Sequence, residues 1–365
     1  MIKHWKKSKL EDVITIKYGK DHKLLQQGNI PVYGSGGIIR YINKSLYEDV
    51  SILIPRKGSL NNIFYMYKPF WTCDTMFYTI IDKNKILPKF LYYQLKLFDF
   101  STLNVGSAIP SLTVPVINDI EIQIPDLSTQ KRIAEILSGY DDLIENNLKQ
   151  ISLLEESAAR LYKHFFSSPK KDNGKGESNG QIKDIAKLLS GFAFKTKDFT
   201  EQGQYKIVTI KNVQDGYFDG KICNKIATIP SRMPEHCILK EGDLLLSLTG
   251  NVGRMCIVYG KNYLLNQRVA KLSTKYKAYS YCLFRSKEIV TELNNMANGS
   301  AQQNLSPIRT ENFAIHIPPT EQIEQFEQLV NPIIDKIILL NKSIELYRKS
   351  RDLLLPKLMS GELQV

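Results

Sequence analysis

Residue types that carry acid–base, metal and phosphoryl chemistry occur in this sequence, but not at catalytic spacings. Asp21-His22-Lys23 has the Asp-x-Lys shape of a Mg²⁺-dependent nuclease site, yet no partner carboxylate lies on a preceding strand. The five histidines form no His-Glu-x-x-His pattern, and no Gly-x-x-x-x-Gly-Lys-Ser/Thr loop is present. We therefore predict that residues 21–23 form a solvated loop, and that DNA cleavage and translocation are not functions of this chain.

Methyl transfer to an amino group would need a glycine-rich loop after a strand and an Asp/Asn/Ser-Pro-Pro-aromatic loop that grips the target. The glycine-dense segment 33–37 stands alone, and the Pro318-Pro319 pair lies between Ile317 and Thr320, which are the wrong neighbours. We predict a structural turn at residues 33–37. The sequence thus predicts no catalytic site, and no cofactor or metal bound by this chain.

The five cysteines are scattered, and no two of them have Cys-x-x-Cys spacing: Cys73, Cys223, Cys237, Cys256 and Cys282. This pattern indicates neither a zinc site nor a disulfide framework. We predict that each cysteine is a small buried apolar side chain.

The net charge of the chain is +12. A basic excess of this size favours a polyanionic partner such as double-stranded DNA, because neutralising phosphates releases condensed counterions. The alternative is that a lysine-rich proteome produces basic proteins whatever their partners. No apolar run approaches the roughly 20 residues of a membrane span, and the N-terminus lacks the apolar stretch of a secretory signal. We expect a cytoplasmic protein without membrane partners.

Side chains that can read DNA gather in loops of both halves of the chain. Arg, Lys, Asn and Gln can bond base edges, whereas Ser, Thr and Tyr hold phosphates. The candidates are Tyr33, Ser35, Arg40, Arg56, Lys57, Ser59 and Ser107 in the first half, and Lys195, Lys197, Lys211, Asn212, Thr249, Asn251, Arg254, Asn266, Gln267, Arg268, Gln302, Gln303 and Asn304 in the second. Several of these could instead cap turns, so we expect about half to reach DNA; burial of Asn266 and Gln267 within the fold is equally open.

The segments that must position these loops occur twice, as an internal repeat of the sequence. Gly106-Ser107-Ala108 with Leu112 returns as Gly299-Ser300-Ala301 with Leu305, at an offset of 193 residues. Alternating apolar residues follow in both copies and end at Pro125 and at Pro318, which predicts a half-buried strand in each. Residues 128–130 and 320–322 then supply helix starts.

Each copy continues into a long helix whose apolar positions keep a strict 4-3 spacing. We predict a pair of packed seams, made by Ile133, Leu137, Tyr140, Ile144, Asn147, Ile151, Leu154, Ala158, Leu161 and Phe165 in the first helix, and by Phe326, Val330, Ile333, Ile337, Leu340, Ile344, Tyr347, Arg351, Leu354 and Leu358 in the second. Asn147 either fixes the register as a buried polar group or points to solvent. Arg351 is expected to mark a place where the helices diverge, or to extend its charge into water.

The expected organisation is two dissimilar, strand-rich heads on a repeated strut. The boundaries are 1–127 for the first head, 128–167 for the first spacer helix, 168–180 for a flexible Gly-rich linker, 181–319 for the second head, and 320–361 for the second helix with a tail to 365. Spacing alone leaves the relative direction of the helices open.

With these features in view, the chain resembles the specificity subunit of type I restriction–modification systems over essentially its whole length. The resemblance is carried by the duplicated helices, by residues 242–245 with 249–253, by residues 265–268, by Ile124-Pro125 and Ile317-Pro318, and by residues 358–363. It implies an α+β fold: two mixed target recognition domains separated by an antiparallel coiled coil, with an internal pseudo-two-fold repeat.

The resemblance also implies a function and partners. Each domain would read one half of a bipartite, gapped site, and the helices would dock two modification (methyltransferase) subunits. S-adenosylmethionine would then be bound by those partners, and ATP and Mg²⁺ by two restriction (translocase-nuclease) subunits where these are present. Two alternatives stay open: a specificity subunit of a restriction class with modification and cleavage in one polypeptide, and a coiled-coil interaction protein with incidental charge.

Overall fold

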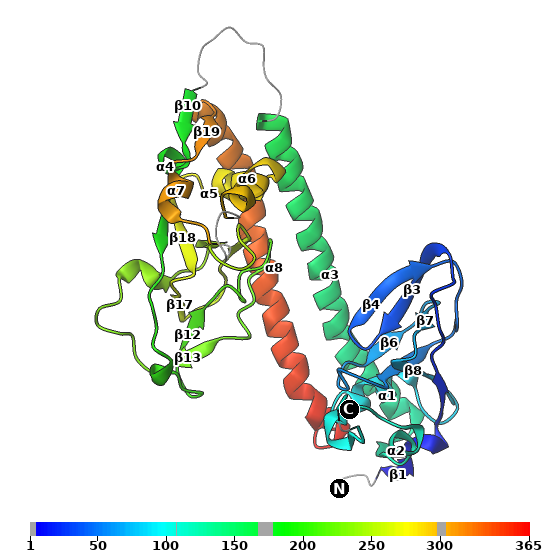
Figure 1. Cartoon of the computed structure of the whole chain (residues 1–365). Coiled ribbons are helices and arrows are strands. Elements are labelled where there is room, and N and C mark those ends of the chain that lie inside the picture. The colour runs from blue at the N-terminus through cyan, green and yellow to red at the C-terminus, as the bar shows by residue number, and fades with distance from the viewer. Residues whose placement is uncertain (1–4, 107, 167–177, 298–303) are drawn as a thin grey trace. The chain divides into compact units, whose positions relative to one another are not determined.

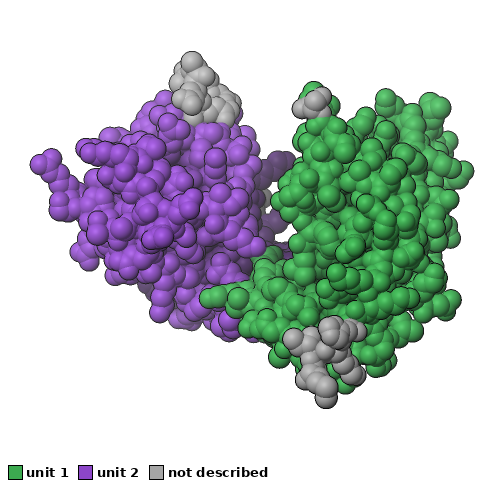
Figure 2. Space-filling view, turned by 90° about the horizontal axis from the view of Figure 1, so that it is seen from below, with its two compact units in different colours: residues 1–143, 347–365 green, residues 144–346 purple. Residues whose placement is uncertain are grey.

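The computed structural model describes residues 5–106, 108–166, 178–297 and 304–365. The chain divides into two compact units: unit 1 is Met1–Leu143 with Tyr347–Val365, and unit 2 is Ile144–Leu346 (Figure 2). This division cuts each long helix within its length, after Leu143 in α3 and after Leu346 in α8, whereas the sequence suggested boundaries at the helix ends. The reason is that each half-helix shares a hydrophobic core with one head.

The two long helices are α3 (Leu127–Phe166) and α8 (Thr320–Met359), each of 40 residues (Figure 1). At 1.5 Å per residue each is a rod of about 60 Å. The Asp126 carboxylate caps the start of α3 by accepting from the Thr129 amide at 2.9 Å. Gly361 follows α8 with φ +73°, the left-handed conformation that closes a helix end. Of the described helices, none is long and apolar enough to cross a membrane.

Unit 1 combines three sheets with short helical pieces. Its described strands are β1 (Lys6–Lys9), β2 (Ile14–Tyr18), β3 (Gln27–Gly34), β4 (Gly37–Ile42), β5 (Ser51–Pro55), β6 (Phe64–Met66), β7 (Trp71–Thr72), β8 (Met76–Ile81) and β9 (Glu121–Ile124). They form the sheets β1-β9, β2-β8-β5-β6 and β4-β3-β7. The helical pieces are η1 (Leu10–Asp12), α1 (Pro88–Leu95), η2 (Phe100–Leu103) and α2 (Val114–Asn118).

Unit 2 repeats this plan with different lengths. Its described strands are β10 (Ser178–Gln181), β11 (Ala186–Ser190), β12 (Tyr205–Val208), β13 (Asn224–Ile226), β14 (Ile238–Leu239), β15 (Leu244–Ser247), β16 (Met255–Ile257), β17 (Tyr263–Leu265), β18 (Val269–Thr274) and β19 (Ala314–Ile317). They form the sheets β10-β19, β11-β18-β15-β16 and β13-β12-β17-β14. The helical pieces are α4 (Ile182–Ile185), η3 (Thr196–Asp198), η4 (Glu235–Cys237), α5 (Lys277–Arg285), α6 (Lys287–Ala297) and α7 (Pro307–Glu311).

The duplication predicted from the sequence is confirmed in strand order as well as in sequence. The sheet β2-β8-β5-β6 corresponds to β11-β18-β15-β16, and each unit has a second sheet containing one parallel pair, β3 with β7 and β12 with β17. Residues 178–180, expected to belong to the linker, instead begin β10, where Gly180 lies opposite Ile315 of β19. A Gly-rich segment forms a strand here because β19 offers a free edge for pairing.

The seam positions of both helices lie inside the two cores. In unit 1, Ile133 and Leu137 of α3 and Leu358 of α8 are fully buried. In unit 2, Ala158 of α3 packs in one cluster with Phe326 and Val330 of α8. The remaining seam residues are buried or half-buried, with Tyr140, Ile151, Leu154, Leu161, Phe165, Ile333, Tyr347 and Leu354 half-buried and Ile144, Ile337, Leu340 and Ile344 buried.

Within each unit the two helices run antiparallel. In unit 1 the rings of Tyr140 and Tyr347 lie 6.5 Å apart, so the first half of α3 packs on the last third of α8. In unit 2 the rings of Phe165 and Phe326 lie 5.6 Å apart, and Gln322 donates from Nε2 to the Phe165 carbonyl at 2.7 Å. The start of one helix therefore lies beside the end of the other.

The two polar seam residues are both held in the protein. Asn147 is 7% exposed, so it does not point into solvent. Arg351 forms an ion pair across the helices with Asp141 of α3, and its side chain is 18% exposed. The expectation that Arg351 extends into water or marks a divergence is therefore wrong. In the sequence, Arg351 is only an interruption in the row of apolar seam positions. In the structure, a carboxylate on the facing helix is the partner of its guanidinium.

Candidate DNA-contact loops

The topology of each unit brings several loops to one edge. Parallel neighbours end at the same edge of a sheet, so the segments that follow them meet there. In unit 1, Val32 of β3 pairs with Trp71 of β7; in unit 2, Val208 of β12 pairs with Leu265 of β17. The loops after these strands, and the loop after β5 or β15, carry most of the DNA-contact candidates found in the sequence.

In unit 1 these segments form what we call loop cluster 1: residues 34–36, 56–59, 73–75 and 111. The Ser35 amide lies 3.4 Å from Thr75 Oγ1, and the Arg56 amide donates to the Thr75 carbonyl at 2.8 Å. Lys57 and Ser111 form a β-bridge. Asn62 donates from Nδ2 to the Ser35 carbonyl at 2.8 Å. Backbone and side-chain bonds thus tie all the segments together.

In unit 2 the corresponding segments form loop cluster 2: residues 209–211, 248–254, 266–268 and 304. The Leu248 amide donates to the Arg268 carbonyl at 3.0 Å, as the Arg56 amide does to Thr75 in unit 1. Thr249 forms a β-bridge with Asn304. The position of Asn304 in this bridge is that of Ser111 in unit 1, at the same offset of 193 residues.

Glycines allow the loops to approach the neighbouring chain closely. A Cβ placed on Gly19 would lie 1.9 Å from the Cys73 carbonyl oxygen, and a Cβ on Gly191 would lie 2.3 Å from the Asn266 carbonyl oxygen. The two glycines occupy the same place in the two units, at the end of β2 and of β11. Only glycine fits there.

The unit 1 candidates fall mostly in or beside cluster 1. Ser35, Arg56, Lys57 and Ser59 belong to it; Ser59 is exposed and the others are half-buried. Arg56 donates from Nη1 to the Asp74 carbonyl at 3.2 Å and lies over the Tyr18 ring.

Two further unit 1 candidates lie on the β3–β4 hairpin. Tyr33 is the last residue but one of β3, packs on Phe64 at 5.2 Å between ring centroids, and has its pKa raised by burial. Arg40 of β4 is not joined to the cluster by its side chain, which donates from Nη2 to the Leu25 carbonyl at 3.0 Å.

The unit 2 candidates Lys211, Asn266, Gln267 and Arg268 line one surface pocket of about 640 Å³. Asn266 is half-buried and the other three are exposed, so the alternative of burial fits Asn266 better than Gln267. Asn266 accepts from the Arg268 amide at 3.3 Å with Oδ1. Lys195 and Lys197 are exposed, the first just before η3 and the second on it, and Asn304 is exposed beside Thr249.

Asn212 is a correction to the sequence-based set. The residue is 1% exposed and its side chain is used entirely within the fold. Its Oδ1 accepts from the Thr209 amide at 2.7 Å, and its Nδ2 donates to the carbonyls of Asp219 and Ile222 at 2.7 and 2.8 Å. Asn212 therefore ties the loop 209–223 together and is not available to DNA. The sequence alone does not distinguish an Asn that holds a loop together from an Asn that contacts DNA. Only the bonding partners in the structure separate the two roles.

Arg254 and Asn251 are also bonded within the protein. Arg254 donates from Nη1 to the Gln214 Oε1, and the Asn251 amide oxygen, turned toward it, accepts from the guanidinium at 3.1 Å. The Arg254 amide donates to Ser247 Oγ at 3.0 Å, and Ser247 Oγ donates to the Asn251 carbonyl at 2.5 Å. These bonds hold loop 248–254 in one shape, in which Thr249 is half-buried.

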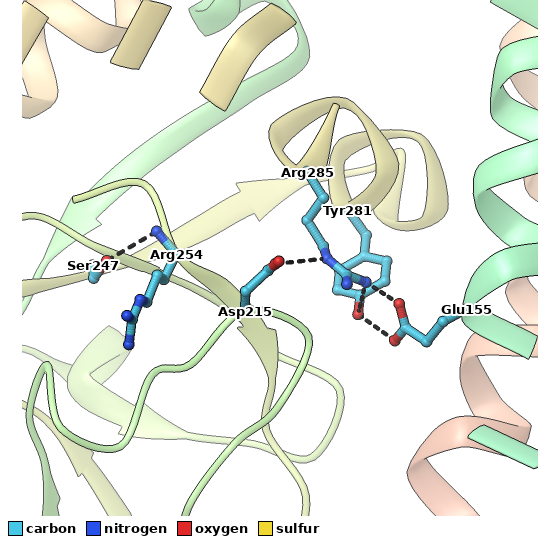
Figure 3. A network of polar contacts seen from close by, with 6 residues as sticks. All are labelled: Glu155, Asp215, Ser247, Arg254, Tyr281 and Arg285. Atoms are coloured by element: carbon cyan, nitrogen blue, oxygen red, sulfur yellow. Dashed lines mark hydrogen bonds and ion pairs between the residues drawn. The ribbon is translucent and has the colours of Figure 1, made fainter. Parts of the chain in front are cut away.

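A polar network anchors the same region to α3 (Figure 3). Glu155 of α3 accepts from the Tyr281 hydroxyl at 2.6 Å and from Arg285 Nη1, both on α5. Arg285 also donates from Nε to Asp215 at 3.0 Å. Since Asp215 follows Gln214, the partner of Arg254, one run of bonds connects the spacer helix with loop cluster 2.

Some predictions concern residues that the structure does not describe: Ser107, Gln302 and Gln303 lie outside the described residues. Sequence reasoning missed Asp74 and Thr75 in cluster 1, and Lys221 and Asn224 in the unit 2 pocket. The offset of 193 residues that matches the helices also pairs Asp74 with Gln267, and this signal was available in the sequence.

Most of the cysteines lie inside the fold. Cys73, Cys237, Cys256 and Cys282 are buried and Cys223 is half-buried, so the prediction of buried thiols is confirmed for four of the five. In the parts of the chain that the structure describes, no group of three or more His, Cys, Asp or Glu side chains is placed to hold a metal ion.

Comparison with known proteins decides the family. The model of the type I restriction modification DNA specificity domain matches residues 2–156 and again residues 176–346. The chain belongs to this family. It is a specificity subunit of a type I restriction–modification system, the non-catalytic DNA-recognition component of such a system. Membership decides against a coiled-coil interaction protein with incidental charge.

Individual relatives agree with this assignment. The specificity subunit is 29% identical over 348 residues to the type I restriction enzyme MjaIX specificity subunit of Methanocaldococcus jannaschii, covering 88% of this chain and 79% of the relative. It is 24% identical to a putative type I specificity subunit of Haemophilus influenzae over 90% of this chain and 88% of the relative. Its fold matches the crystal structure of the S subunit from M. genitalium with a TM-score of 0.66 at 16% identity, covering 97% and 96% of the two chains.

Proposed function

We propose that this specificity subunit reads a bipartite, gapped site in double-stranded DNA, with loop cluster 1 reading one half and loop cluster 2 the other. The observation that carries the proposal is the repetition of one loop arrangement with different side chains. Lys57 and Ser111 occupy in unit 1 the bridge that Thr249 and Asn304 occupy in unit 2. The same backbone frame with different donors and acceptors suits two different sequences. Each cluster would enter a major groove and read about 3 to 5 base pairs.

The long helices would set the gap and carry the partners. Both are continuous over 40 residues, so neither has a break at which the spacing could relax. They also carry exposed leucines outside the seam, among them Leu148, Leu153, Leu329, Leu339, Leu346 and Leu353. Exposed apolar rows of this kind suit the docking of other subunits.

The partners would be two modification subunits, with two restriction subunits where these are present. The modification subunits would bind S-adenosylmethionine and extrude the target base, and the restriction subunits would use ATP and Mg²⁺. The complex would act in the cytoplasm, where chromosomal DNA lies.

The proposal is tested by co-expressing the specificity subunit with its modification subunit and sequencing host DNA with detection of methylated bases. We expect one asymmetric motif with two specified halves and an unspecified gap. Methylation of a contiguous palindrome would contradict the proposal, and so would the absence of methylation by an assembled complex. Binding by the specificity subunit alone is not the readout, because the assembled complex is the form that acts.

The role of the helices is tested separately by length. Adding one helical turn to α3 or to α8 should change the gap and leave both specified halves unchanged. The same number of residues added between 167 and 177 provides the matched control, and should leave the gap as it was. A gap that ignores the helix insertions would contradict the spacer role.

A further inference from the structure

The loops that follow β7 and β17 are held by the same backbone bonds in the two units. The Lys20 amide donates to the Thr72 carbonyl at 2.8 Å, and the Phe192 amide donates to the Leu265 carbonyl at 2.9 Å. After Thr72 and after Leu265, the chain leaves the parallel pair of strands and continues to β8 or to β18. Residues 73–75 and 266–268 thus follow one path, at a constant offset of 193.

Further bonds fix both ends of these three-residue loops. The Gly19 amide donates to the Met76 carbonyl at 3.1 Å, and the Gly191 amide donates to the Val269 carbonyl at 3.2 Å. The carbonyls of Thr75 and Arg268 each accept from the loop after β5 or β15. A backbone held from two sides presents its side chains in a defined geometry, which a reading position needs.

The side chains at the middle of the two loops differ in chemistry and are exposed. Asp74 lies in unit 1 where Gln267 lies in unit 2, and both are exposed. Within the part of the chain that the structure describes, the side chains of Asp74, Gln267 and Arg268 form no hydrogen bond or ion pair. The side chains of Asn212 and Arg254 do form such bonds. These side chains are therefore ready to bond another molecule.

We propose that Asp74 and Gln267 are corresponding specificity positions, each reading base edges in one half of the bipartite site. This inference rests on the proposed function and names the residues that distinguish the halves. A carboxylate only accepts, so Asp74 suits an exocyclic amino group, such as N4 of cytosine. Gln267 both donates and accepts and suits N6 and N7 of adenine, while Arg268 beside it suits O6 and N7 of guanine.

The charges around each position support this assignment. Lys211 and Lys221 line the same pocket as Gln267 and Arg268 and can hold the phosphates that flank a base read there. In unit 1 the Arg56 guanidinium lies against the Asp74 carbonyl, at 3.2 Å from Nη1, which offsets the repulsion between a carboxylate and the DNA backbone.

The test uses the complex of the specificity subunit with its modification subunits. The variants are Asp74→Asn, Asp74→Glu, Gln267→Ala and Lys221→Ala, with Lys261→Ala as control because Lys261 is exposed at the other end of β17. Methylated host DNA gives the motif, and competition with mismatched duplexes gives the discrimination at each base pair.

We expect Asp74→Asn to alter one or two adjacent positions of one half, with discrimination there falling at least about tenfold. Asp74→Glu should retain the wild-type preference for an amino group in part. Gln267→Ala should relax positions in the other half only. Lys221→Ala should weaken binding to all sequences and lower the salt dependence, without changing the motif. Lys261→Ala should change neither.

Three results would overturn the inference. The first is an assembled complex in which Asp74→Asn and Gln267→Ala leave every position of the motif unchanged. The second is that both variants affect the same half. The third is loss of all methylation by a folded, assembled Asp74→Glu complex. Failure of the proposed function looks different, since the wild-type complex would then yield no gapped motif. The unaltered half of each motif serves as the folding control. If a variant methylates nothing, its thermal unfolding shows whether it still folds, and Asp74→Glu tests the same position with the charge retained.

Discussion

Nη1 of Arg351 lies 2.5 Å from Oδ1 of Asp141, so the last part of α8 is bonded to the first half of α3 inside unit 1. The other carboxylate oxygen of Asp141 accepts from the Tyr93 hydroxyl of α1, also at 2.5 Å. One carboxylate thus joins both long helices to the head of unit 1. Neither group is far exposed, with 18% for the Arg351 side chain and 26% for that of Asp141.

Replacing Asp141 with alanine should lower the free energy of unfolding by about 1–3 kcal/mol, because it leaves the Tyr93 hydroxyl and part of the Arg351 guanidinium without an acceptor. Urea denaturation of the variant and the wild-type chain measures the change. The control is Glu135→Ala, which breaks an exposed pair with Lys131 and should cost less than about 1 kcal/mol. Equal effects of the two substitutions would show that the Asp141 contacts add nothing.

Asn212→Ala should destabilise unit 2, because Asn212 holds the fold together and does not contact DNA. The substitution removes bonds to Thr209, Asp219 and Ile222 in a site that is 1% exposed, which should cost at least about 2 kcal/mol. The neighbouring Lys211→Ala is the matched control and should keep the stability while weakening DNA binding by the assembled complex. An Asn212→Ala chain as stable as wild type would contradict the structural role assigned to Asn212.

Gly19→Ala and Gly191→Ala should each damage one loop cluster. Their Cβ atoms would meet backbone oxygens at 1.9 and 2.3 Å, so the loop after β7 or β17 must move. Gly36→Ala is the control in cluster 1, because nothing lies within 4 Å of its added Cβ. In the modification complex, we expect each of the first two variants to impair recognition of its own half-site, and Gly36→Ala to behave more nearly as wild type. The expectation would be contradicted if Gly36→Ala impaired recognition of a half-site while Gly19→Ala and Gly191→Ala did not.

The thiol of Cys223 should react slowly in the folded chain. Burial raises its pKa from 9.0 to about 11, so at pH 8 its thiolate fraction is about 100-fold lower than that of an unfolded thiol. A raised pKa means that the thiol contributes stability fully below pH 9, and that this contribution is lost as the pH rises through about 11. Iodoacetamide labelling located by mass spectrometry should show a rate at Cys223 that climbs up to about pH 11. A rate that levels off below pH 9 would contradict the raised pKa.

The architecture could be predicted from the sequence because its signals are periodic. The 4-3 spacing and the offset of 193 identify α3, α8 and the strands before them, since burial of a helix face imposes that spacing on the chain. The loops give no such signal. Asn212 and Gln267 are both polar loop residues, but the first is enclosed by carbonyls and the second is exposed, and this difference comes from contacts far apart in the chain.

Arg351 shows the same limit inside a helix. The sequence marks it as a break in an apolar stripe, and its partner Asp141 lies 210 residues away. Asp74 shows the opposite case, in which the sequence did contain a signal but the type of residue argued against a DNA contact. Its correspondence with Gln267 follows from the offset, yet a carboxylate is a poor first guess for a surface that binds a polyanion.

The central claim is that each unit reads one half of a two-part site. The most direct measurement is the exchange of residues 1–106 for the corresponding segment of another specificity subunit, followed by sequencing of methylated host DNA in the complex with the same modification subunits. The account predicts that one half of the motif changes to that of the donor, while the gap and the other half stay as they were. A motif that changes in both halves, or in neither, would contradict it.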